Sequence, residues 1–250
     1  MILLELSLGF AIGLSLGLLG GGGSLLTVPA LVYFVGQSPR AAVTTSLAIV
    51  GANSMVGAIF HGSHGRLDLK VALVFGSAGM LASYLAADIS KHISPELLLV
   101  AFAFLMIGIA FMLLLRRTKE QETAHMSRPL WMVFASGAGV GLLTGILGVG
   151  GGFLVVPALV MLVGLPVPTA IGTSLIVIAM NSIAGFLGHL GTGVADWMAI
   201  LVFTSAGLLG TFSGMKLSRQ LSSSKLQKAF AVFVIALAIF LLIDNLPKLF

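Results

Sequence analysis

The 250-residue sequence contains no cysteine and few charged or acidic side chains. Without cysteine, the chain can form no disulfide, no thiolate nucleophile and no thiolate metal ligand. Charged residues make up 8% of the chain and hydrophobic residues 58%, whereas about a quarter of a soluble domain is charged. With a mean hydropathy of +1.14, the composition excludes a soluble globular protein. It predicts an all-α polytopic membrane protein.

Basic residues outnumber acidic ones, 13 to 8. In a membrane protein such an excess reports orientation and contact with anionic lipid headgroups, so nucleic acid is not an expected partner. The first apolar segment, from Ile2, has no basic region before it and carries Glu5. We therefore expect a retained span rather than a cleaved signal. The sequence has no Walker motif, which leaves secondary or passive transport as the transport classes, and no cofactor is expected.

Two glycine runs interrupt the apolar segments. Gly20 to Gly23 precede Ser24 and a short apolar stretch containing Pro29, and Gly148 to Gly152 precede a similar stretch containing Pro157. Each glycine costs a helix about 1 kcal/mol relative to alanine, so the backbone is predicted to unwind at both runs. Within a membrane, unwound backbone is tolerated where protein or a polar cavity satisfies its N–H and C=O groups. The segment after each run is predicted to be a short half helix.

The second glycine run lies 128 positions after the first, and the same offset relates many polar residues without a gap. It maps Thr45, Ser46, Asn53, Ser54, Gly57, His61 and Asp68 onto Thr173, Ser174, Asn181, Ser182, Gly185, His189 and Asp196. This agreement indicates an internal duplication. We expect a first repeat over residues 1–115, a polar linker over 116–129 and a second repeat over 130–250, each repeat with five membrane segments.

Lysine and arginine discriminate between two topologies. Five crossings per repeat invert the second repeat and place ten basic residues on one side, leaving Arg40, Lys91 and Lys248 on the other. Four crossings per repeat give seven against six. Because positively charged loops stay in the cytoplasm, the first arrangement is favoured. It predicts inverted repeats with a cytoplasmic linker and both termini outside.

The helix starts after the glycine runs are candidates for an anion site. A helix N-terminus offers unpaired N–H groups and about half a positive charge, so it can bind an anion without lysine or arginine. The alternative is that the glycines only allow close helix packing. Two related breaks, each followed by a short helix, favour a substrate site. The candidate residues are Gly22, Gly23, Ser24, Gly150, Gly151 and Gly152.

A polar stripe follows on the next segment of each repeat. At 100° per residue, Ser46 and Asn53 lie within about 20° of each other on a helix, and Ser174 and Asn181 repeat the pattern. Hydroxyl and amide groups are suitable donors to an oxyanion in a neutral pocket. The alternative is that they bond neighbouring helices. Thr45, Ser46, Asn53, Thr173, Ser174 and Asn181 complete the candidate substrate-binding set.

Other chemistry has weaker support. His61, His189, Asp68 and Asp196 are candidates for proton coupling, and too few ligands accompany them for a metal site. An intramembrane serine hydrolase would need Ser24 as its nucleophile. The sequence has no Gly-x-Ser-x-Gly arrangement there, and the duplicate carries Gly152 in its place.

The repeated motifs resemble those of a known family. A glycine run leads into Val-Pro-Ala-Leu at Gly20–Leu31 and at Gly148–Leu159, and related motifs follow at 42–47 and 170–175. Together they resemble the sulfite exporter TauE/SafE family over nearly the whole chain. The resemblance implies an inner-membrane permease for sulfite, sulfoacetate or a related organosulfonate, driven by a proton or sodium gradient. We therefore expect a secondary transporter with alternating access and not an enzyme, and an anion channel is the alternative. Substrate identity and transport direction stay open.

Overall fold

The computed structural model describes residues 2–19, 21, 23–62, 67–90, 94–115, 129–147, 152–189, 195–218 and 223–249. Within these residues all regular structure is helical, which confirms the predicted all-α class. The first half contains α1 (Ile2–Leu19), α2 (Ser24–Tyr33), α3 (Pro39–Gly62), α4 (Leu69–Ser90) and α5 (Pro95–Leu115). The second half contains α6 (Leu130–Leu147), α7 (Gly152–Ala158), η1 (Leu159–Val163), α8 (Val167–His189), α9 (Trp197–Ser218), α10 (Ser223–Asn245) and η2 (Leu246–Leu249).

Separate helices precede and follow each glycine run, as predicted, and residues 148–151 of the second run lie outside the described residues. The first break separates α1 from α2 and the second separates α6 from α7. At 1.5 Å per residue the ten residues of α2 extend about 15 Å, half the thickness of a bilayer core. The helix ends at Tyr33, and the chain then turns through Gly36, which has a φ of +79°. Gly164 makes the equivalent turn after η1, with φ of +86°.

The second short segment differs from the first in one respect that the sequence did not predict. It begins as α-helix and widens into the π-helix η1 directly after Pro157 and Ala158. Proline has no N–H to donate to the preceding turn, and the π-helix begins two residues after it. The two half helices are therefore similar in position and unequal in backbone geometry.

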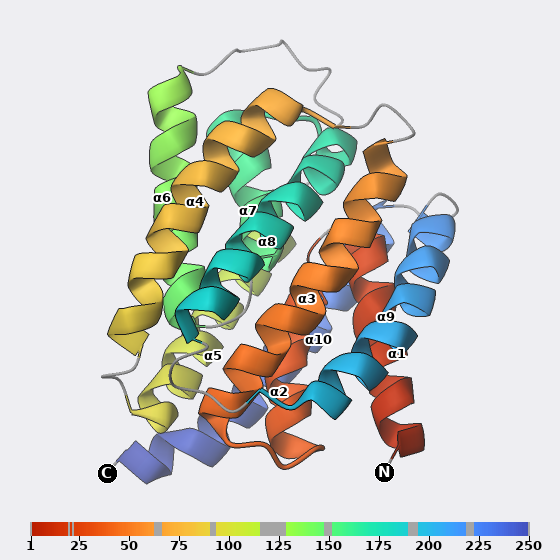
Figure 1. Cartoon of the computed structure of the whole chain (residues 1–250), viewed down its shortest axis with the longest axis vertical. Helices are drawn as coiled ribbons and strands as arrows, with labels where there is room; N and C mark the ends of the chain where they lie inside the picture. Colours follow the sequence, from red (N-terminus) through yellow and green to blue (C-terminus); the bar gives the residue numbers. More distant parts are fainter. Residues whose placement is uncertain are drawn as a thin grey trace.

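Six helices lie side by side in the order α6, α4, α8, α3, α9, α1 (Figure 1). Helices α5 and α10 pack against each other outside this row. Both chain ends lie at the same end of the bundle (Figure 1). Among the described residues, the four central helices of the row are long and apolar enough to cross a membrane.

Glycines set the spacing at both ends of the row. A Cβ on Gly13 of α1 would lie 2.6 Å from the carbonyl carbon of Gly207 on α9. A Cβ on Gly141 of α6 would lie equally close, 2.6 Å, to the carbonyl carbon of Gly79 on α4. The backbones touch at these points, which is typical of small residues between membrane helices. The glycines are thus needed for packing in addition to any role at the breaks.

The two central helices, α3 and α8, run antiparallel. Gly57 of α3 faces Leu175, and Leu47 faces Gly185 of α8, with an added glycine Cβ lying 3.2 Å from a leucine methyl in both cases. Leu47 and Leu175 are buried. On the outer surface of the row, large apolar side chains such as Leu201 and Leu209 of α9 are exposed. Such surfaces suit contact with lipid rather than water.

Candidate functional site

The two chain breaks meet inside the protein. A Cβ on Gly152, at the start of α7, would lie 2.7 Å from the carbonyl oxygen of Gly21 and 2.8 Å from Ser24 Oγ. Gly21, Ser24 and Gly152 are all buried. Gly22, Gly150 and Gly151, which were also predicted as substrate-binding residues, lie outside the described residues.

Ser24 and Thr27 stabilise the start of α2 through bonds to the glycine run itself. Ser24 Oγ donates to the carbonyl oxygen of Gly21 at 2.8 Å, and Thr27 Oγ1 donates to that of Gly23 at 3.2 Å. The Ser24 hydroxyl hydrogen is therefore already donated to a nearby backbone carbonyl. Its oxygen keeps lone pairs but donates nothing further in this conformation.

Asn53 of α3 and Asn181 of α8 are the most unusual polar side chains in the bundle. They are 1% and 0% exposed, and neither Nδ2 nor Oδ1 of either amide has a hydrogen-bond partner. Leaving a buried amide unpaired costs about 1–3 kcal/mol. The neighbouring hydroxyls of Ser54 and Ser182 are also buried without a partner. Buried polar groups are normally paired, so these four side chains require an explanation.

Each asparagine amide lies against a glycine of the other half. A Cβ on Gly207 of α9 would be 2.5 Å from Asn53 Nδ2, and one on Gly79 of α4 would be 2.6 Å from Asn181 Oδ1. All three nearest atoms belong to the asparagine in both cases. The sequence alone did not single out Gly79 and Gly207. The only sequence signal is that they share the 128-residue offset.

Thr45 and Thr173 link the two halves. Thr45 Oγ1 on α3 accepts a hydrogen bond from the backbone N–H of Asp196 at 3.3 Å, and Thr173 Oγ1 on α8 accepts one from Asp68 at 3.0 Å. Both threonines are fully buried. These two candidate substrate ligands therefore also have a structural role, since each accepts a hydrogen bond from a backbone N–H of the opposite half.

Asp68 and Asp196 cap the helices that follow them. Asp68 Oδ1 accepts from the N–H of Val71, and Asp196 Oδ1 accepts from that of Ala199, both at 3.0 Å. An aspartate at this position satisfies one of the free N–H groups of the first helical turn. Gln37 Nε2 also donates to Asp196 Oδ2 at 3.0 Å. These carboxylates, candidates for proton coupling, thus have a helix-capping role.

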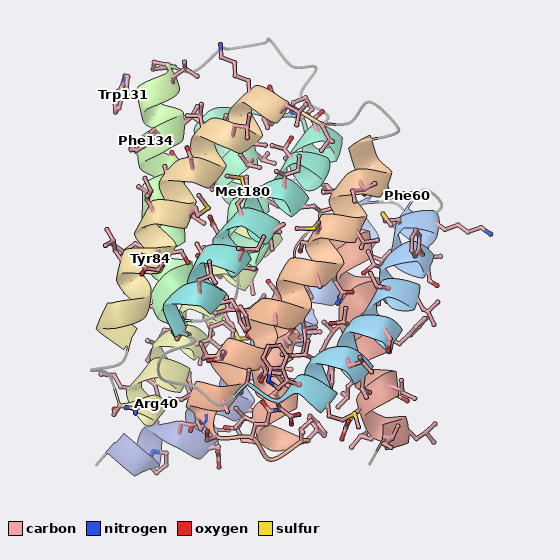
Figure 2. All side chains as sticks on the ribbon, in the orientation of Figure 1. Arg40, Phe60, Tyr84, Trp131, Phe134 and Met180 are labelled. Atoms are coloured by element: carbon pink, nitrogen blue, oxygen red, sulfur yellow. The ribbon has the colours of Figure 1, made fainter. Side chains whose placement is uncertain are left out.

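The remaining candidates lie on α3 and α8. Ser46 Oγ donates to the carbonyl of Val43 at 2.9 Å, and Ser174 Oγ donates to that of Ile171 at 2.7 Å. His189 Nδ1 lies 2.8 Å from the carbonyl oxygen of Gly185, one turn earlier in its own helix. Arg40 lies at the end of the bundle that holds the chain termini, away from the middle of α3 (Figure 2).

The described residues contain no group of three histidine, aspartate or glutamate side chains able to hold a metal ion. The described residues instead contain a pair of helix breaks that meet, a pair of unpaired amides and a pair of threonine links. Each pair has one member from each half of the chain. The apolar exterior, the four membrane-length helices and the polar groups inside define a polytopic membrane protein with a polar interior.

The comparisons with known proteins agree with this class. The model of the sulfite exporter TauE/SafE family matches residues 6–241, and the chain belongs to this family. The chain is similar to a "Probable membrane transporter protein" of Xylella fastidiosa (strain Temecula1), with 33% identity over 96% of this chain and 95% of the relative. Another relative, "Probable membrane transporter protein YdhB" of Bacillus subtilis (strain 168), is 24% identical over 88% of this chain and 91% of its own.

A third relative is "Probable membrane transporter protein YfcA" of Escherichia coli (strain K12), which is 28% identical over 84% of this chain and 77% of its own. No solved structure matches the chain. The family and the names of the relatives indicate a membrane transporter. They agree with a function in transport rather than catalysis.

Proposed function

We propose that the protein is a secondary transporter for a small sulfur-containing anion, such as sulfite, sulfoacetate or a related organosulfonate. The observation that carries this proposal is the meeting of two broken helices, at Gly21 and Gly152, in a bundle that also buries two unpaired amides. Paired broken helices are the best pointer to a substrate site in a transporter. The matched family is described as a sulfite exporter family, which supports a sulfur anion as the substrate.

We propose that residues 1–115 and 130–250 form inverted repeats, joined by a cytoplasmic linker at 116–129. The described part of the structure supports this arrangement in two ways. The equivalent helices α3 and α8 run antiparallel, and the contact of α1 with α9 is matched by that of α6 with α4. Transporters with inverted repeats alternate access by rocking one half against the other.

The substrate would bind to N–H, amide and hydroxyl groups near the middle of the bundle. The proposed residues are Gly22, Gly23, Ser24, Thr45, Ser46, Asn53, Gly150, Gly151, Gly152, Thr173, Ser174 and Asn181. Among those described, Asn53 and Asn181 offer donors that nothing else uses, whereas the threonines and serines have partners within the protein. The two asparagines are therefore expected to contribute most to binding.

Flux through proteoliposomes tests the function. Labelled sulfite should enter in a saturable manner and show counterflow, with sulfate, sulfoacetate and taurine as competitors that define the selectivity. A channel with the same lining would give flux that neither saturates nor shows counterflow. Imposed proton and sodium gradients, applied separately, identify the coupling ion. The proposal is wrong if none of these anions crosses the membrane faster than in protein-free liposomes.

Replacement of Ser24 with alanine separates a transporter from an enzyme. The change would abolish a serine hydrolase, but it should only weaken anion transport. Topology is tested in parallel, since the chain has no cysteine of its own. Single cysteines at Ser38 and Ser222 should react with a membrane-impermeant thiol reagent from opposite faces, with Ser38 on the periplasmic side of an inner membrane.

A further inference from the structure

We propose that the unpaired amides form two separate anion subsites, one on each side of the central helix pair, rather than converging on one central site. The first subsite lies where Asn53 meets Gly207, and the second lies where Asn181 meets Gly79. The proposal rests on the proposed transport function and specifies how its substrate site is built.

The order of the helices separates the two amides. Helices α8 and α3 are neighbours at the centre of the row, with α4 beyond α8 and α9 beyond α3 (Figure 1). The Asn53 amide contacts α9, and the Asn181 amide contacts α4. The two amides therefore point away from each other, into different helix interfaces.

The depth of the two amides is nevertheless similar. Gly51 of α3 lies beside Ser182 of α8, with an added Cβ 3.1 Å from the serine Cβ. Asn53 is two residues from Gly51 on α3, and Asn181 is next to Ser182 on α8. Both asparagines therefore lie close to this contact between the two antiparallel helices. An anion could thus occupy equivalent positions on either side of the same crossing point.

Glycine is required opposite each amide. At Gly79 and at Gly207 the three atoms nearest to an added methyl group all belong to the asparagine side chain, and the nearest amide atom would lie at most 2.6 Å away. A methyl group at that distance must displace the amide, since non-bonded heavy atoms normally stay about 3.5–4 Å apart. Glycine at these positions lets each amide lie directly against the helix backbone, and no group within the protein accepts from its N–H groups, so a small anion with several oxygens can accept from them.

The two subsites have the same amide and differ in a neighbouring group. Thr204, one turn before Gly207 on the same face of α9, has a buried hydroxyl without a partner. The equivalent position on α4 is Gly76, where the sulfur of Met180 lies 2.6 Å from an added Cβ. Met180 is labelled in Figure 2. The Asn53 subsite therefore has one more hydroxyl donor available, and we expect it to bind the anion more tightly.

Equilibrium binding of labelled sulfite to the purified full-length protein tests the proposal. We expect two sites per chain, with either Asn53→Ala or Asn181→Ala removing one of them. Loss of a hydrogen bond to a charged ligand should weaken the affected site by about tenfold or more. A single site in the wild-type protein, or the loss of both sites from one substitution, would overturn the two-site arrangement.

Double variants make the test specific to the pairs. Gly207→Ala should weaken the same site as Asn53→Ala and add nothing to it, whereas Gly207→Ala should add fully to Asn181→Ala. Gly79→Ala should behave in the same way with the partners exchanged. Gly139→Ala is the control, because a Cβ there meets no atom within 4 Å.

Two failures can be told apart. If wild-type protein binds and transports sulfite but Gly207 couples equally to both asparagines, only the two-subsite proposal is wrong. If the folded wild-type protein neither binds nor moves any of the sulfur anions, the proposed function is wrong and the subsites are wrong with it. Each variant is assayed at a temperature below its own Tm, so that a change in binding is not caused by unfolding.

Discussion

Replacement of Gly152 with alanine should destabilise the protein, because the two chain breaks touch there. The added Cβ would lie 2.7 Å from the carbonyl oxygen of Gly21, 2.8 Å from its Cα and 2.8 Å from Ser24 Oγ. Each distance is short of the optimal separation by about 1 Å. Two of the three atoms are backbone and cannot rotate away, so a shift of one half relative to the other is required. Overpacking of this kind costs about 1–3 kcal/mol.

Thermal unfolding of the purified protein measures this effect. For a chain of this size, about 1–3 kcal/mol corresponds to a fall in Tm of roughly 2–12 °C. Gly139→Ala is the matched control, because no atom lies within 4 Å of its Cβ and alanine is the better helix former by about 1 kcal/mol. Its Tm should stay the same or rise slightly. Equal Tm values for Gly152→Ala and the control would refute the close approach of the two breaks.

Three further changes have defined outcomes. Thr173→Val removes the acceptor of the Asp68 N–H and should lower stability by about 1–3 kcal/mol, whereas Thr173→Ser should retain most of it in the same Tm assay. Gln37→Leu removes the bond to Asp196 and should cost only about 1 kcal/mol, because the equivalent residue of the other half, Leu165, is already apolar. Asn181→Leu removes an unpaired buried amide, so it should raise Tm while it lowers sulfite flux in proteoliposomes; a lower Tm would contradict the unpaired state.

Much of the fold could be predicted from the sequence because its signals are local. Long apolar segments predicted an all-helical chain, which the described residues confirm. Glycine runs predicted both helix breaks, since the cost of glycine in a helix acts within a few residues. The π-helix after Pro157 was not predicted, because its sequence resembles that of the first half, where the segment with Pro29 stays α-helical.

The site was less predictable, because its contacts join residues far apart in the chain. The polar stripe identified Asn53 and Asn181, but nothing local indicates that each amide lies on a glycine of the opposite half. The threonines illustrate the same limit. A hydroxyl on a helix face predicts a hydrogen bond, and only the packing shows that Thr45 receives the N–H of Asp196.

Each half of the chain buries one unpaired asparagine amide at a cost in stability, and this argues for a ligand. Each unpaired amide costs about 1–3 kcal/mol, and proteins are typically stable by only about 5–15 kcal/mol in total. A leucine of similar size would avoid that cost in either position. The chain instead holds Asn53 and Asn181 buried, unpaired and opposite glycine in both halves. A bound anion that accepts from these N–H groups would restore the lost hydrogen bonds, and it would do so only in conformations that keep each asparagine next to its glycine. Binding energy at the subsites would then depend on how the halves pack, as coupling of substrate binding to a rocking motion requires.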